Sequence, residues 1–304
     1  MKQYFTSLFI LFSLFWSTVQ AIEWEKQLWR SVQFAAVWGS SPTDIFAVGD
    51  HGAIFHYDGF TWWKMESGTD SPLSDVWGSS NTDVFAVSAL DSTILHYDGH
   101  HWTQMKYSEI NFNLNSIWGS SGNNVFVVGM GGTILHYDGS HWTQMDSGTN
   151  CSLKDIWGTS NTNVFAVCWN TILHYDGNHW EKMDLELEDR FYFENIWFEN
   201  IWGSSSTDIF VTGISNGAGT LLHYDGHQWA IIDTGIDSKL VELWGTSGTN
   251  VFAVSSDSHI LHYDGNRWAI MTQIYSSTQP FSSAITGIWG SFSDNVFAVG
   301  DGQI

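Results

Sequence analysis

Residues 114–145 read LNSIWGSSGNNVFVVGMGGTILHYDGSHWTQM, and this stretch holds one complete unit of a repeat that runs through the chain. The runs at 114–118 and 125–128 are apolar, β-branched and aromatic, which is typical of short buried strands. Two further strands are predicted on either side of Asp138-Gly139, a dipeptide that favours a tight hairpin because its backbone can reach positive φ. The unit is therefore predicted to form four short strands.

The repeat is marked by two tryptophans. A Trp-Gly pair opens each unit, and a His-Tyr-Asp-Gly segment followed by a second Trp closes it. The first series consists of Trp38, Trp77, Trp118, Trp157, Trp202, Trp244 and Trp289, and the aspartates of the closing segments are Asp58, Asp98, Asp138, Asp176, Asp225 and Asp264. The units begin near residues 34, 73, 114, 153, 198, 240 and 285. Four-stranded units of about 40–45 residues are typical of β-propeller blades.

These repeated residues have a structural interpretation. A flat indole at the same place in every blade fills the space between adjacent sheets, and each aspartate caps its own turn. The alternative is a ring of ligand sites repeated around the propeller. We expect an all-β propeller of about seven four-stranded blades, forming a single domain over residues 22–304.

The two ends of the chain are predicted to share the last blade. Trp24 stands 14 residues before Trp38, much as Trp142 stands 15 before Trp157, so residues 22–27 resemble a fourth strand. We expect residues 285–304 and 22–27 to close the ring, which removes exposed strand edges. The third strand of that blade is only a stub, so either the blade lacks a strand or the sequence is part of a longer surface protein.

Residues 1–21 read as a secretory signal peptide. Lys2 precedes an apolar run at 5–16, and Val19-Gln20-Ala21 places small residues at a cleavage site. The run is too short for a spanning helix. The mature chain is therefore expected to be exported, to the periplasm, the cell surface or the medium, with no membrane span.

The blade core Ile134-Leu135-His136-Tyr137-Asp138-Gly139-Ser140-His141-Trp142 resembles the Asp-box (BNR) hairpin of sialidase-type propellers. It is also similar to propellers related to the photosystem II stability and assembly factor. In this chain His replaces the Ser/Thr of that box, and four residues rather than five separate Asp from Trp. The resemblance implies a propeller architecture and no particular chemistry, because Asp-boxes lie away from sialidase active sites.

No catalytic constellation emerges from the motifs. A sialidase-like site needs three clustered arginines, and the whole chain has only Arg30, Arg190 and Arg267, far apart in the repeat pattern. Gly213-Ile214-Ser215-Asn216-Gly217 matches a nucleophile elbow, but it lies between two strands rather than between a strand and a helix. The alternative enzyme is a glycoside hydrolase or lyase, which would need two carboxylates about 5–10 Å apart in the central cleft.

Composition limits the partners. With 10 Lys+Arg against 32 Asp+Glu, the net charge of −22 argues against nucleic-acid binding. No Cys/His zinc spacing and no calcium-loop motif is present. We expect no cofactor, leave calcium open without assigned ligands, and expect a monomer.

The two cysteines, Cys151 and Cys168, both fall in the fourth unit, before its first strand and at the end of its second. Pairing of these strands about the turn near 160–161 would bring the two residues to roughly diagonal positions. Since export permits oxidation, a disulfide between them is a hypothesis.

The loops indicate which face of the ring binds a ligand. Turns between strands one and two, and between strands three and four, hardly change between units, whereas loops between strands two and three and between blades vary. Function tends to lie on variable loops held by a rigid scaffold. The candidate contacts are Trp169, Tyr192, Phe193, Asp50 and His51. The favoured function is an exported, non-catalytic propeller that binds a protein or glycan partner.

Overall fold

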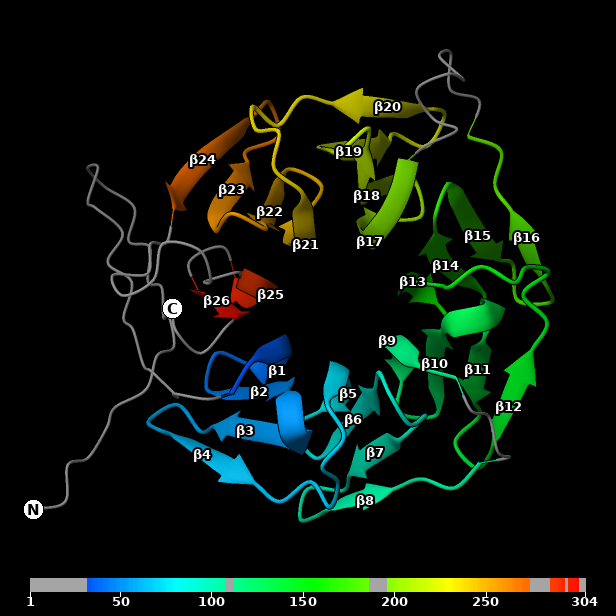
Figure 1. Ribbon diagram of the computed structural model, residues 1–304, viewed down its shortest axis with the longest axis vertical. Helices are drawn as coiled ribbons and strands as arrows, with labels where there is room; N and C mark the ends of the chain where they lie inside the picture. The colour runs from blue at the N-terminus through cyan, green and yellow to red at the C-terminus, as the bar shows by residue number, and fades with distance from the viewer. Residues whose placement is uncertain (1–31, 108–111, 186–195, 274–284, 293–294, 301–304) are drawn as a thin grey trace, which may run out of the picture.

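The strands form a closed ring of sheets in a computed structural model that describes residues 32–107, 112–185, 196–273, 285–292 and 295–300 (Figure 1). Six antiparallel sheets have four strands each, and in the seventh the described residues form two strands. We number these sheets as blades 1 to 7 in chain order. The expected all-β propeller with four-stranded blades is thereby confirmed.

Within each blade the strands run outward from the centre in chain order. The innermost strands are β1 (Phe34–Ser41), β5 (Leu73–Ser80), β9 (Leu114–Ser121), β13 (Asp155–Ser160), β17 (Ile196–Ser205), β21 (Leu240–Ser247) and β25 (Ile285–Phe292). The second strands are β2 (Asp44–Gly49), β6 (Asp83–Ser88), β10 (Asn124–Gly129), β14 (Asn163–Cys168), β18 (Asp208–Ser215), β22 (Asn250–Ser255) and β26 (Asn295–Gly300).

The outer half of each complete blade is a hairpin. The third strands are β3 (Ala53–Tyr57), β7 (Ile94–Tyr97), β11 (Ile134–Tyr137), β15 (Thr171–Tyr175), β19 (Ala218–Tyr224) and β23 (His259–Tyr263). The fourth strands are β4 (Trp62–Met65), β8 (Trp102–Gln104), β12 (Trp142–Met145), β16 (Trp180–Lys182), β20 (Trp229–Ile232) and β24 (Trp268–Gln273). Single 3₁₀ turns, η1 (Asp50–Gly52) and η2 (Met130–Gly132), follow β2 and β10.

The hydrophobic core lies between neighbouring blades. Second strands such as β10 are apolar at consecutive positions because both faces of each sheet are covered by an adjacent sheet. One cluster, for example, joins Phe126 and Val128 of blade 3 to Ile156 and Val164 of blade 4. Each blade therefore depends on its two neighbours for burial, as repeat architectures generally do.

The Trp-Gly pair is explained by a contact between blades. A methyl group built on the glycine of each pair would lie 2.6–2.8 Å from the indole ring of the preceding blade's tryptophan. Trp157 thus covers Gly203, and at the junction of the two ends Trp289 covers Gly39. The tryptophan packs against a glycine because the space leaves no room for a side chain. Within one motif, therefore, the Trp contacts the following blade and the Gly contacts the preceding one.

The first and last blades are joined directly. Thr286 Oγ1 donates to Phe34 O at 2.6 Å, and Phe297 and Val299 of β26 belong to the same hydrophobic cluster as Phe55 of blade 1. The predicted closing strand at 22–27 and the predicted signal peptide at 1–21 lie outside the described residues. Within the described residues no helix is long and apolar enough to cross a bilayer.

The His-Tyr-Asp-Gly segments are tied to their own blades. Asp138 Oδ1 accepts from the backbone N–H groups of Ser140 and His141, and the aspartates of the other five segments do the same at their own turns. His136 Nε2 lies 2.7 Å from Asn124 Oδ1, and its ring stacks on Phe126. These contacts give the repeated His and Asp structural roles within each blade.

Candidate binding site

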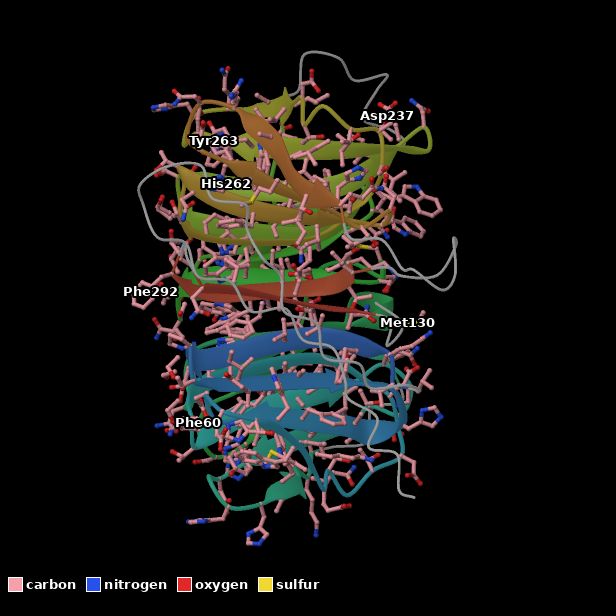
Figure 2. All side chains as sticks on the ribbon, turned by 90° about the vertical axis from the view of Figure 1, so that its left-hand side faces the viewer. Phe60, Met130, Asp237, His262, Tyr263 and Phe292 are labelled. Atoms are coloured by element: carbon pink, nitrogen blue, oxygen red, sulfur yellow. A yellow bond between two sulfur atoms is a disulfide. The ribbon has the colours of Figure 1, made fainter. Side chains whose placement is uncertain are left out.

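The propeller has one uniform face and one varied face, seen edge-on in Figure 2. Phe60, in a hairpin between third and fourth strands, and Phe292, at the end of β25, lie on one side. Met130, between second and third strands, and Asp237, between two blades, lie on the other. We call the latter the variable face, because its loops differ from blade to blade.

Backbone geometry separates the two faces as well. On the uniform face each Asp-Gly turn places its glycine at positive φ, as at Gly139 (φ 91°). Among the described residues, the non-glycine residues with positive φ are His51, Ser92, Trp169, Asn216 and Ser258, and each lies between the second and third strands of its blade. Side chains on left-handed backbone, which is rare and strained, are thus confined to the variable face.

Trp169 is the least expected of these residues. Cys168 pairs with Thr171, so Trp169 and Asn170 form a two-residue turn, and Trp169 has φ 36° at a position that favours glycine. Its side chain is nevertheless 57% exposed. A large aromatic residue is therefore held in solvent by a strained turn, and such outliers tend to persist where they serve a function.

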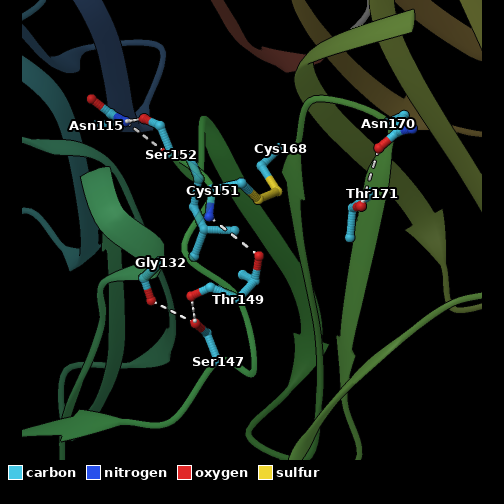
Figure 3. The surroundings of a disulfide bond; sticks show 10 residues. Asn115, Gly132, Ser147, Thr149, Cys151, Ser152, Cys168, Asn170 and Thr171 are labelled. Carbon is cyan, nitrogen blue, oxygen red and sulfur yellow. Dashed lines mark hydrogen bonds between the residues drawn. A yellow bond between two sulfur atoms is a disulfide. The ribbon is translucent and has the colours of Figure 1, made fainter. Parts of the chain in front are cut away.

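A disulfide fixes the base of this turn (Figure 3). Cys151 and Cys168 are bonded, with their Cα atoms 6.2 Å apart. The linker that carries Cys151 is itself tied to blade 3, because Gly132 N donates to Cys151 O at 2.8 Å and Ser147 Oγ donates to Gly132 O at 2.7 Å. The residue next to Trp169 is thus anchored both to its own sheet and to the neighbouring blade.

A second exposed tryptophan lies beside the turn. The innermost strand of blade 5, β17, begins at Ile196, and Phe198 N donates to Trp169 O at 2.6 Å. Neighbouring residues of a strand point to opposite sides, so Phe198 is buried while Trp197 is 60% exposed. Trp169 and Trp197 are therefore both exposed near the backbone bridge between Trp169 and Phe198, at the junction of blades 4 and 5.

Other exposed apolar side chains extend this pair. On the variable face they come from the loops of blades 2 and 3 and from the linker between these blades, namely Leu90, Met130 and Phe112. In the described residues, blades 1, 6 and 7 contribute no large exposed hydrophobic side chain to this face. The apolar surface is thus an arc over one side of the ring, which we call the apolar arc.

The remaining predicted contacts are polar or lie outside the described residues. Asp50 and His51 form the η1 turn of blade 1, separated in the ring from blade 4 by two blades (Figure 1). His51 borders a polar cavity of about 220 Å³ that Lys64, Glu66 and Asp70 also line. Tyr192 and Phe193 lie outside the described residues, and their role in binding stays a prediction.

The centre of the ring carries a polar network that the motif analysis missed. It involves the residue two positions before the Trp of each Trp-Gly pair. In each blade this residue faces the equivalent residues of the adjacent innermost strands. From blade 1 to blade 7 these residues are Ala36, Asp75, Ser116, Asp155, Asn200, Glu242 and Gly287. Alignment of the repeats would have revealed it, because the next position in each strand is always Val, Ile or Leu.

The network links successive blades by hydrogen bonds. Asp155 Oδ2 accepts from Asn200 Nδ2 at 2.7 Å and from Ile201 N at 2.8 Å. Asn200 Nδ2 also donates to Glu242 Oε1 at 3.0 Å. Ser116 Oγ lies 2.9 Å from Asp75 Oδ2 and 2.6 Å from Asp155 Oδ1. A hydroxyl has one proton to donate, so both contacts are hydrogen bonds only when one carboxyl is protonated.

The electrostatics agree with a shared proton. Burial, followed by repulsion from Asp155, raises the pKa of Asp75 to about 7. Burial raises the pKa of Asp155 as well, and burial together with repulsion from Asp155 and Asp75 raises the pKa of Glu242. Three carboxylates at the centre of the ring therefore resist full ionisation near neutral pH.

These carboxylates are structural in their contacts. Both oxygens of Asp75 and of Asp155 accept hydrogen bonds from backbone N–H groups, two of them in the next blade, at Ile117 and Ile201. In the part of the chain that is described, no group of three or more His, Cys, Asp or Glu side chains is placed to hold a metal ion. The network thus holds innermost strands together, with the carboxylates of Asp75 and Asp155 on either side of Ser116.

Removing the disulfide is expected to loosen the Trp169 turn. With Cys151 and Cys168 both replaced by serine, the exchange rate of the Phe198 N–H should rise about tenfold, because the acceptor Trp169 O loses its anchor. Hydrogen exchange read by NMR measures this rate. A backbone hydrogen bond within blade 6, from Ser256 N to Lys239 O, serves as the internal control. Unchanged exchange at Phe198 would show that the turn is held without the disulfide.

Comparisons with known proteins support the fold. No family model matches the sequence, and the search for related curated proteins finds no match. Among solved structures, YCF48 bound to D1 peptide is similar with a TM-score of 0.71 and 14% identity, covering 91% of this chain and 93% of that one. This likeness confirms the propeller fold that the resemblance to assembly-factor propellers implies.

Two further structures share the architecture. The extracellular domain of the hybrid two-component system BT4673 from B. thetaiotaomicron gives a TM-score of 0.69 at 13% identity, over 97% of this chain and 39% of that one. Virginiamycin B lyase from Staphylococcus aureus gives 0.71 at 8% identity, over 88% and 94%. Similar propellers thus include a protein bound to a peptide and a lyase, so the fold alone does not select a function.

Proposed function

We propose that the chain is an exported, non-catalytic propeller that binds a protein partner through the apolar arc, with Trp169 and Trp197 as its main contacts. The observation that carries this proposal is the exposed Trp169 on left-handed backbone, anchored by the disulfide and bridged to blade 5. Exposed tryptophans on a rigid support are typical of binding hot spots, because they bury large area at low entropic cost.

The composition of the arc favours a protein over a glycan. Leu90 and Met130 have flexible apolar side chains. A sugar surface is mostly polar, so it gives such side chains few favourable contacts. Protein surfaces in contrast bury aliphatic and aromatic side chains together, with methionine and aromatic residues enriched. The similar fold of YCF48 bound to D1 peptide supports a peptide-like ligand for a propeller of this kind.

Export is supported by three features of the chain. The first is the signal-like pattern at 1–21, and the second is the pairing of the two cysteines, which is typical of oxidising compartments. The third is the net charge of −22, which keeps a tryptophan-rich protein soluble. We further propose that the propeller has seven blades and acts as a monomer.

The test is a screen of the purified chain against a displayed peptide library and a glycan array. A peptide ligand recovered from the screen is expected to bind Trp169→Gly at least about 30-fold more weakly, a loss of about 2 kcal/mol. Glycine suits the positive φ at this position, so the variant should unfold at the same temperature as the parent or a higher one. Calorimetric titration and thermal unfolding measure the two effects.

Phe60→Ala is the matched control. Phe60 is 92% exposed and lies on the uniform face, so its loss removes an equally prominent aromatic side chain without touching the arc. Equal weakening by Phe60→Ala and Trp169→Gly would rule out the arc as the site. If the two screens recovered only glycans, the proposed protein partner would be wrong and the ligand would be a sugar.

A further inference from the structure

The polar cavity beside His51 is formed by a turn, a strand end and a linker of blade 1. Its volume is about 220 Å³, and it lies between the turn that follows β2, the end of β4 and the linker at 66–70. Pockets for drug-sized ligands have volumes of about 300–1,000 Å³. The cavity therefore has room for a small organic molecule.

Blade 3 has the same turn without a side chain at its centre. The turns η1 of blade 1 and η2 of blade 3 are both single 3₁₀ turns whose middle residue has positive φ. This residue is Gly131 in blade 3 (φ 65°) and His51 in blade 1 (φ 56°), where the backbone conformation is strained for a residue with a side chain. Blade 1 thus places an imidazole beside the cavity at a position that suits glycine.

The linker of blade 1 carries a free carboxylate at a position where blades 3 and 5 use theirs to cap a turn. In blade 3 Asp146 Oδ1 accepts from Gly148 N at 2.9 Å, and the corresponding aspartate of blade 5 makes the same contact. Blade 1 has the longer Glu66 at this position, and its carboxylate has no hydrogen-bond partner among the described residues. This carboxylate is therefore available to a ligand in the cavity that it lines.

Two further charged residues distinguish the cavity from the same place in blade 3. Lys64 of β4 and Asp70 of the linker line it, whereas blade 3 has the neutral Gln144 and Asn150 at these positions. In the part of the chain that is described, no ion pair or side-chain hydrogen bond joins Lys64, Glu66 or Asp70 to one another. One ammonium group and two carboxylates therefore line the cavity without neutralising one another.

We propose that this cavity binds a free basic amino acid, such as lysine, ornithine or arginine. The carboxylate of the ligand matches Lys64, and its two cationic groups match Glu66 and Asp70, so each charge of the site meets an opposite one. Hydrogen bonds between charged groups are roughly twice as strong as those between neutral groups, so this match gives both affinity and selectivity. The site lies in blade 1 and is separate from the apolar arc.

The test is calorimetric titration of the full chain with L-lysine and two analogues. L-norleucine lacks the side-chain ammonium group, and 1,5-diaminopentane lacks the carboxylate. The full chain is expected to bind L-lysine one to one and each analogue about tenfold more weakly, the size of one lost hydrogen bond between charged groups. Because the net charge of −22 attracts any cation, equal binding of L-lysine and 1,5-diaminopentane would overturn the proposal.

Three variants separate the possible outcomes. Lys64→Gln should weaken the binding of L-lysine about tenfold without weakening that of 1,5-diaminopentane, because only the partner of the carboxylate is gone. Lys182→Gln is the matched control, since Lys182 stands opposite Leu173 in blade 4 as Lys64 stands opposite Phe55 in blade 1. Trp169→Gly should also keep the affinity for L-lysine, so failure of the apolar arc leaves this result intact. No binding of L-lysine to the full chain, or equal losses in the two lysine variants, would overturn the proposal.

Discussion

Gly203→Ala is expected to lower the free energy of unfolding by about 3 kcal/mol. The added methyl group would lie 2.6 Å from the Trp157 ring and 2.8 Å from the backbone oxygen of Asp208. The Trp157 ring belongs to blade 4 and the Asp208 oxygen to the neighbouring strand of blade 5 itself, so both the contact between the blades and the pairing of β17 with β18 have to adjust. Overpacking of this kind costs about 1–3 kcal/mol or more. Chemical denaturation followed by tryptophan fluorescence and circular dichroism measures the loss.

A double-mutant cycle assigns that loss to the Trp-Gly contact. With Trp157 already replaced by alanine, Gly203→Ala should cost at least 1 kcal/mol less, on the order of couplings between touching residues. Gly217→Ala is the control, because nothing lies within 4 Å of its added methyl group and only its positive φ opposes the change. A cost at Gly203 that stays the same without Trp157 would contradict the proposed packing.

Glu242→Gln is expected to stabilise the protein by about 1–3 kcal/mol at pH 8, since neutral replacements of buried charges often stabilise. Glutamine keeps the oxygen that accepts from Asn200 and removes one of three mutually repelling carboxylates. The gain should shrink steadily between pH 8 and pH 5. Thermal unfolding of both proteins across this range measures it.

The sign follows from proton binding. A carboxyl whose pKa rises on folding stabilises the native state when the pH is below its unfolded pKa, near 4. This stabilisation is lost as the pH rises through the folded pKa, which is about 7 for Asp75. Burial lowers the pKa of His136, His174 and His262, which destabilises the native state below about pH 6.5. These histidines contribute equally to both proteins, so the difference between the two isolates the carboxylates.

Glu199→Gln supplies the matched control for this effect. Glu199 is one residue before Asn200 of the network but pairs with Lys239 at 3.3 Å, so its charge is compensated. The substitution should give no gain in stability at pH 8. If Glu242→Gln were neutral or destabilising throughout the range, the three carboxylates would not repel one another as inferred.

Much of the fold could be predicted from the repeat. Strand number per blade, the Asp-Gly hairpins and the division into a uniform and a variable face depend on residues close together in sequence. The bond between Cys151 and Cys168 depends on the same local order, because both residues belong to one blade. The motif analysis also named Trp169, although its bridge to Phe198 depends on a contact between blades 4 and 5.

The central network was beyond that reasoning. Asp75, Ser116 and Asp155 stand about 40 residues apart, and they meet only because ring closure brings equivalent positions of successive blades together.

The excess of tryptophan illustrates the same division. By itself the sequence determined that 13 of the 19 tryptophans belong to two periodic series, which predicts a ring of blades. The tertiary structure alone decided that each Trp of a Trp-Gly pair rests on the glycine of the following blade. Turn chemistry acts over a few residues, whereas contacts between sheets depend on how the blades pack around the ring.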